Sequence, residues 1–188
     1  MTPKAGLLLR SKPATAALIV VCAILGIGLS VFVLQTEKLT SGRGDELIHD
    51  LPPDNNTLIV AHTYDSGVTD EGLLFLRDSH PQLEVLSITQ CPKITNRGVE
   101  IIGGMVNLKT LQLQGRLGFD QSSLQFLEGC RHLTELSLTG LDIDVKGVQS
   151  ILKLRSLKTL IVSRGRTSEK AQEMLEEQRE HIYVQFIG

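Results

Sequence analysis

Hydrophobic positions recur along most of the chain with a period of 24 or 25 residues. The frame L-x-x-L-x-L, or a close variant of it, occurs four times. Its alternating apolar positions predict a short strand with one face directed inward. Between these frames, apolar residues three positions apart follow a small residue, which predicts a short helix. The four strand frames begin at Leu83, Leu108, Leu133 and Leu157.

A strand–helix unit of this length cannot bury its own apolar stripe, so the units are expected to stack. The fold class predicted is therefore α/β, a short solenoid with a parallel sheet on one side and helices on the other. Residues 57–60 and 183–186 are expected to add an opening and a closing strand. A small residue in each helical frame predicts close backbone packing where the helix begins. These residues are Gly72, Gly98, Ser123, Gly147 and Ala171. Side chains three positions earlier are expected to cap the helices, namely Thr69, Thr95, Asp120, Asp144 and Ser168.

One segment indicates the type of repeat. Residues 83–99 read LEVLSITQCPKITNRGV, which resembles the cysteine-containing leucine-rich repeat, L-x-x-L-x-L-x-x-C-x-x-I-T-D-x-G-L. The resemblance extends over roughly residues 55–188 and implies a horseshoe-shaped interaction module. Cys91 alone occupies the cysteine position, because Arg116 and Leu141 replace it in the next two units. The residues before the repeats do not resemble an F-box, which weighs against a ubiquitin-ligase role.

An uncharged run from Pro13 to Thr36 precedes the repeats, and 12 of the 17 residues from Leu18 to Leu34 are Leu, Ile, Val or Phe. About 20 apolar residues are needed to cross the hydrocarbon core of a bilayer. The run therefore predicts a transmembrane helix over residues 14–35. The alternative is a cleaved signal peptide, with Gly26 and Gly28 as the small residues of its cleavage site.

The charges on either side of this run predict its orientation. Lys4, Arg10 and Lys12 precede the run, whereas Lys38 and Arg43 follow it. The positive-inside rule then favours a cytoplasmic N-terminus, with the repeat domain outside the cytoplasm, and the opposite topology is the alternative. The predicted organisation is a basic tail over 1–13, the transmembrane helix over 14–35, a polar linker over 36–50 and a leucine-rich repeat domain over 51–188.

Charge and motif content restrict the function. All 21 acidic residues and 16 of the 19 basic residues follow the apolar run, so the rest of the chain carries a net charge of −5, which argues against nucleic-acid binding. The sequence contains no G-x-S-x-G, no H-E-x-x-H, no phosphate-binding glycine loop and no Cys/His pairs at metal spacing. We therefore expect no enzyme, no cofactor, no metal and no small-molecule substrate. Cys91 and Cys130 are expected to be small core residues.

The outward positions of the predicted strands form a nearly uncharged surface, where Tyr183 is the one large aromatic anchor. We interpret the protein as a membrane-anchored binding or scaffold module with an unidentified protein partner. A cytoplasm-facing adaptor in a ubiquitin-ligase-like or membrane complex is the alternative function, and a solvated face without a ligand is the alternative for the surface. The candidate partner-binding residues are Thr110, Gln112, Glu135, Ser137, Thr159, Tyr183 and Gln185.

Residues 14–35 are expected to anchor the protein, because a retained apolar helix does not leave the bilayer when peripheral contacts are disrupted. After extraction of membranes with alkaline carbonate, the full-length chain should remain in the membrane pellet. Release of a shortened chain that begins near Leu29 would show a cleaved signal peptide instead.

Overall fold

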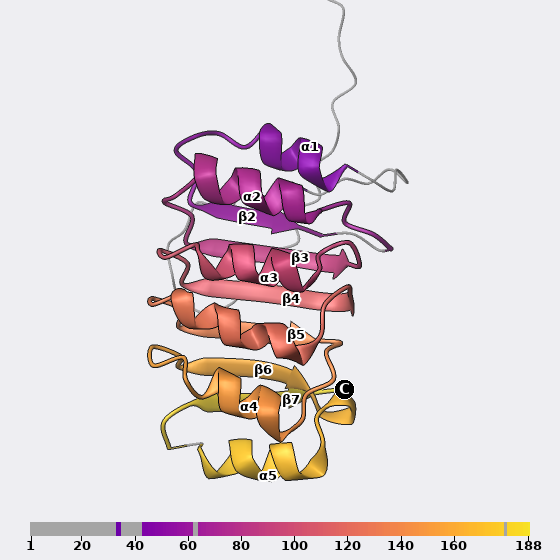
Figure 1. Cartoon of the computed structure of the whole chain (residues 1–188), viewed down its shortest axis with the longest axis vertical. Coiled ribbons are helices and arrows are strands. Elements are labelled where there is room, and N and C mark those ends of the chain that lie inside the picture. Colours follow the sequence, from indigo (N-terminus) through magenta and orange to yellow (C-terminus); the bar gives the residue numbers. More distant parts are fainter. Residues whose placement is uncertain (1–32, 35–42, 62–63, 179) are drawn as a thin grey trace, which may run out of the picture.

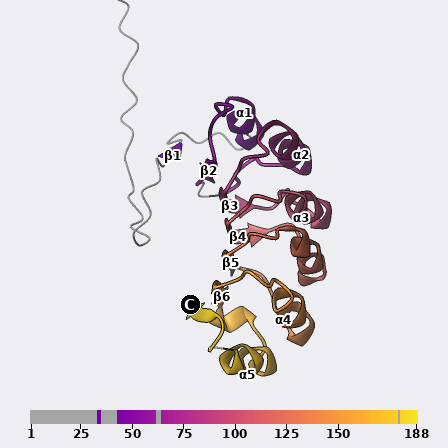
Figure 2. The same cartoon turned by 90° about the vertical axis from the view of Figure 1, so that its left-hand side faces the viewer.

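The computed structural model describes residues 33–34, 43–61, 64–178 and 180–188. Parallel strands follow one another in chain order, and helices join successive strands on one side of the sheet (Figure 1). Seen from the side, the strands follow an arc with the helices on its outer side (Figure 2). The structure is therefore a parallel α/β stack, compatible with the solenoid that the repeat pattern predicts.

Strands and helices alternate along the chain. The strands are β1 (Val33–Leu34), β2 (Thr57–Val60), β3 (Val85–Cys91), β4 (Thr110–Leu117), β5 (Glu135–Thr139), β6 (Thr159–Ser163) and β7 (Tyr183–Ile187). The α-helices are α1 (Gly44–His49), α2 (Asp70–Ser79), α3 (Asn96–Gly103), α4 (Val145–Ile151) and α5 (Glu169–Glu177). There are also two 3₁₀ helices. The first, η1 (Gln121–Gly129), lies between β4 and β5, and the second, η2 (Arg164–Arg166), lies between β6 and α5.

The core lies between the sheet and the helices. Equivalent positions of successive repeats pair in register, so that Leu111 stands beside Leu86 on one side and Leu136 on the other. All three side chains are buried, as the alternation of apolar positions predicts. The first leucine of each strand frame is buried too, at Leu83, Leu108, Leu133 and Leu157.

A helix is present earlier in the chain than the repeat pattern predicted. Residues 44–49, predicted as part of the polar linker over 36–50, form α1, which lies beside α2 (Figure 1). Ile48 is fully buried and Leu51 is 6% exposed, so this stretch contributes to the core. The linker prediction is wrong for these residues. The two buried apolar side chains are enough to pack this six-residue helix against the core, although its other residues are mostly polar.

The predicted transmembrane helix over 14–35 lies outside the described residues, with the exception of Val33 and Leu34. These two residues form β1 and pair in parallel with Ile59 and Val60 of β2, so the structure has a strand there instead of a helix. In the part of the chain that the structure describes, no helix has both the length and the apolar composition needed to cross a bilayer.

The predicted caps are present at the start of the helices. Each cap side chain accepts a hydrogen bond from a backbone N–H in the first turn, which satisfies a donor that has no partner within the helix. The capping residues are Thr69, Thr95, Asp120, Asp144 and Ser168.

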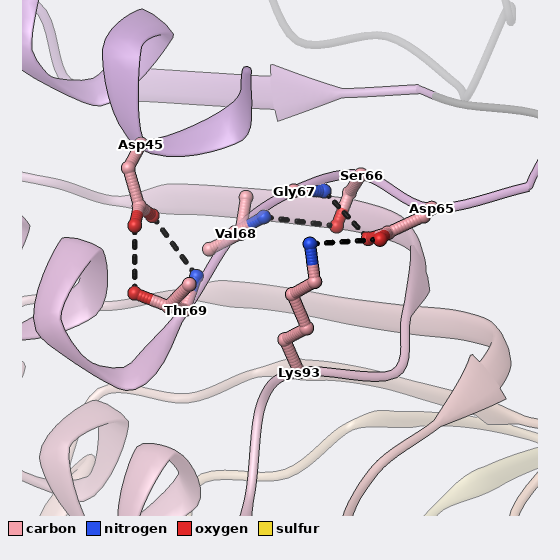
Figure 3. A network of polar contacts seen from close by, with 7 residues as sticks. All are labelled: Asp45, Asp65, Ser66, Gly67, Val68, Thr69 and Lys93. Carbon is pink, nitrogen blue, oxygen red and sulfur yellow. Dashed lines mark hydrogen bonds and ion pairs between the residues drawn. The ribbon is translucent and has the colours of Figure 1, made fainter. Parts of the chain in front are cut away.

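A polar side chain from the first turn of one helix also reaches the cap of the next helix. The Asp45 carboxylate accepts hydrogen bonds from the Thr69 N–H at 2.9 Å and from the Thr69 hydroxyl at 2.6 Å (Figure 3). Asp70 accepts the same two bonds from Thr95, again at 2.9 and 2.6 Å. Each carboxylate therefore joins two neighbouring repeats at the start of their helices.

The next two repeats make the same connection with a neutral amide. Asn96 Oδ1 accepts from the Asp120 N–H at 3.0 Å, and Gln121 Oε1 accepts from the Asp144 N–H at 2.8 Å. We call the four contacts from Asp45, Asp70, Asn96 and Gln121 to the following cap the cap rungs.

The cap rungs account for the glycines among the small residues that the sequence pattern singled out. A Cβ atom added at Gly72 would collide with the Asp45 carboxylate, and one added at Gly98 would collide with the Asp70 carboxylate. The space is therefore needed for the cap rung of the preceding repeat, rather than for the close backbone packing that we expected.

Leu111→Ala tests the inward orientation of the strand frame. Because Leu111 is fully buried, the substitution removes apolar contacts and leaves a cavity. The free energy of unfolding should fall by about 2–5 kcal/mol, as measured by urea denaturation followed by circular dichroism. A loss below about 1 kcal/mol would be incompatible with a closely packed inward position.

Asp70→Ala tests the cap rungs. Asp70 is 9% exposed, and its removal leaves the Thr95 N–H and hydroxyl without their acceptor. The free energy of unfolding should fall by about 1–3 kcal/mol. Glu71→Ala is the matched control. Glu71 is an exposed neighbour in the same helical turn, so its substitution should lower the free energy of unfolding far less. Equal losses for the two variants would show that the rung itself adds nothing.

Candidate functional site

The candidate residues lie on the concave face, which we define as the side chains of β2 to β7 that point away from the helices. The strand register aligns them in rows across the sheet. In a parallel sheet, neighbouring members of a row are about 4.8 Å apart. One row contains Thr57, Val85, Thr110, Glu135, Thr159 and Tyr183, and the next contains Ile59, Ser87, Gln112, Ser137, Ile161 and Gln185. The structure therefore brings all seven predicted residues onto one surface.

Ser137 is on this surface but is not accessible. Only 2% of the residue is exposed, and its register neighbours are the larger side chains of Gln112 and Ile161. Gln114 covers it further by donating a hydrogen bond from Nε2 to Ser137 Oγ at 3.4 Å. The small serine lies below its neighbours on the inside of the arc, so its prediction as a partner-contacting residue is wrong.

Gln112 is partly engaged within the face. The Ser87 hydroxyl donates a hydrogen bond to Gln112 Oε1 at 3.1 Å, and Gln112 is half-buried. A partner would therefore meet an amide group whose oxygen already has one donor. This arrangement holds the side chain of Gln112 in a defined position across two strands.

Accessibility increases toward the last strand. Thr110, Glu135 and Thr159 are half-buried, whereas Tyr183 is 66% exposed and Gln185 is also exposed. The accessible part of the predicted surface is thus centred on β7.

Two isoleucines extend this accessible part. Ile187 is 38% exposed on β7, and Ile161 is half-buried beside Gln185 on β6. Neither was a candidate from the sequence, although the alternation of the strands places both on the concave face. Together with Tyr183 they give this end of the face the apolar surface that protein interfaces use for affinity.

The two rows of the concave face carry one charge. Among the described residues of these two rows, Glu135 is the only group with a charge at neutral pH, and the exposed Arg116 follows near the end of β4. The Thr110 hydroxyl donates a hydrogen bond to Glu135 Oε2 at 3.3 Å, which orients the carboxylate within its row. Neutral side chains therefore make up the rest of these two rows.

The loops at the carboxyl ends of the strands are tied together beside this face. Lys93 Nζ forms an ion pair with Asp65 Oδ2 at 3.0 Å, and Asp65 Oδ1 accepts from the Gly67 N–H at 2.8 Å (Figure 3). The Ser66 N–H donates to the Gln90 carbonyl at 2.7 Å. These contacts hold the loop after β2 against the end of β3 and the loop that follows it.

The two cysteines of the repeats are unsuited to nucleophilic chemistry. Cys91 is fully buried and Cys130 is 3% exposed. Burial raises the pKa of each thiol to about 12, so both remain protonated at neutral pH and the reactive thiolate is scarce. Cys130 donates to the Ile102 carbonyl at 3.2 Å. Both residues therefore act as core side chains, as the sequence suggested.

A pocket of about 320 Å³ lies at the loops after β5 and β6. Its charged lining is already paired, because Arg166 forms an ion pair with Asp142 at 3.1 Å. Asp144 lines the same pocket, and hydrogen bonding with Gln121 and with backbone amides lowers the pKa of its carboxyl group. Within the described ranges, no three His, Cys, Asp or Glu side chains gather as metal ligands would.

Fold and surface together define a parallel α/β repeat structure with a nearly uncharged concave face. No protein-family model matches the sequence.

Proposed function

We propose that the protein is a leucine-rich repeat protein that acts as a non-enzymatic binding or scaffold module, held at a membrane by the apolar run that precedes β1. The family assignment is supported by the L-x-x-L-x-L frame, whose leucines are buried and paired strand to strand. The anchor is supported by the uncharged apolar run alone. The charges around that run favour a repeat domain outside the cytoplasm, whereas a cytoplasm-facing adaptor would need the opposite orientation.

The observation that carries the binding proposal is the accessible end of the concave face. Tyr183 is 66% exposed in a row of small, largely uncharged side chains, with exposed Ile187 on the same strand. Aromatic side chains of this kind provide most of the affinity at protein interfaces. A protein partner with apolar and neutral polar groups is the ligand that this surface fits best.

Substitution of Glu135 and Tyr183 by Ala tests the binding proposal. The pair removes the one charge of the two rows and the largest apolar contact of the face, so the affinity for a protein partner should fall at least about 30-fold, or about 2 kcal/mol. The full-length protein in detergent would be used to capture a partner from membrane extracts. The dissociation constants of both forms would then be measured with the purified partner.

The matched control changes the helix side of the molecule. Glu100, Gln125, Gln149 and Glu173 are exposed there, and their replacement by Ala should leave the affinity unchanged. Circular dichroism should show that both variants keep the native fold. A partner that still binds the Glu135 and Tyr183 variant, but no longer binds the helix-side variant, would place the interface on the opposite side of the molecule.

A further inference from the structure

The cap rungs change from carboxylates to amides along the chain. The first two cap rungs come from the carboxylates of Asp45 and Asp70, and each accepts two hydrogen bonds. The next two come from the neutral amides of Asn96 and Gln121. Asn96 Nδ2 also donates to the Asp120 carboxylate at 3.3 Å, so this amide makes two contacts with the following cap, as each aspartate does. A polar side chain therefore joins the helix starts at each of these four junctions.

The last repeat has no cap rung. Val145 occupies the position of Asp70, Asn96 and Gln121 at the start of its helix, and its side chain has no acceptor atom. The N–H of the following cap, Ser168, donates instead to the Ile143 carbonyl at 2.9 Å. Backbone hydrogen bonds, including the bridge between Ile143 and Thr167, join the two loops at this junction. The ion pair between Arg166 and Asp142 also joins them, but its side chains are 53% and 82% exposed, and exposed ion pairs add little to stability.

The last repeat also buries little apolar surface. In α5 the buried residues are Ala171 and Leu175, whereas α3 buries Val99, Ile101 and Ile102 together with two glycines. In β7 only Val184 is buried. Both views place α5 and β7 at one end of the stack, where neighbouring repeats contact them from one side only (Figures 1 and 2). Few buried apolar contacts are the physical mark of a segment that opens locally.

We infer that η2, α5 and β7 open as a local unit while β2 to β6 remain folded. Tyr183 and Gln185 lie on β7, so opening removes the most accessible residues from the concave face. A partner that contacts them binds only the closed state and shifts the population toward it. This consequence for binding rests on the proposed function, but the opening itself does not.

Hydrogen exchange of the full-length protein in detergent, without any partner, tests the opening. Amides of α5 and β7 should exchange at least about 10-fold faster than those of β4 and β5, since local opening costs less free energy than global unfolding. Equal protection in β7 and β4 would overturn the inference. Because no partner is present, this result is independent of whether the concave face binds one.

Gln121→Ala tests whether the missing rung defines the boundary of the opening unit. The variant removes the last existing cap rung, so fast exchange should extend into α4 and β6 by a factor of about 5, while α2 and β3 stay unchanged. Gln125→Ala is the control, because this exposed residue of the same helix makes no cap rung. Unchanged exchange in α4 and β6 of the Gln121 variant would show that the rungs do not set the boundary.

Discussion

One backbone hydrogen bond, repeated from strand to strand, fixes the arrangement of this protein. The N–H of the first strand residue donates to a carbonyl just before the preceding strand, at 3.0 Å for Thr110 to Glu84 and again for Glu135 to Lys109. The same bond recurs from Tyr183 to Lys158 at 2.7 Å. Because it recurs, inward leucines align with inward leucines, and the outward side chains form rows. The core and the candidate surface thus follow from a single register.

The same register also limits which outward residues a partner can contact. On a sheet that curves away from its helices, outward side chains of neighbouring strands converge, and a small residue between larger ones is covered. Ser137 is covered in this way between Gln112 and Ile161, whereas Tyr183 on the last strand stays open. Position within the row, rather than residue type alone, therefore decides accessibility.

Much of the fold could be predicted from the sequence because it depends on periodicity. The inward leucines and the helix caps are set by local spacing, and the structure confirms both. The six-residue helix α1 was missed because a run this short shows no helical period among its polar residues, although Ile48 is fully buried.

The cap rungs and the accessibility of the face could not be predicted in the same way. Asp45, Asn96 and Gln121 differ in length and charge, so their common role is visible only when the helices are placed side by side. The burial of Ser137 depends on the side chains of two other strands, which no single strand pattern encodes. Local spacing predicts the repeat, but contacts between repeats must be seen in three dimensions.

The left-handed turns at or near the ends of three successive strands, β3 to β5, bear on how the length of such a chain can change. Gln90, Gly115 and Gly140 have φ angles of 54°, 84° and 100°, and they stand at the same place in their repeats. A side chain at Gly140 would collide with the Gly115 carbonyl, so these turns are nested against one another. Insertion of a single residue would displace one turn from its contact with the neighbouring turns and would shift the strand register. Insertion of a whole repeat would preserve both, and an array of this kind is therefore expected to lengthen or shorten by complete units.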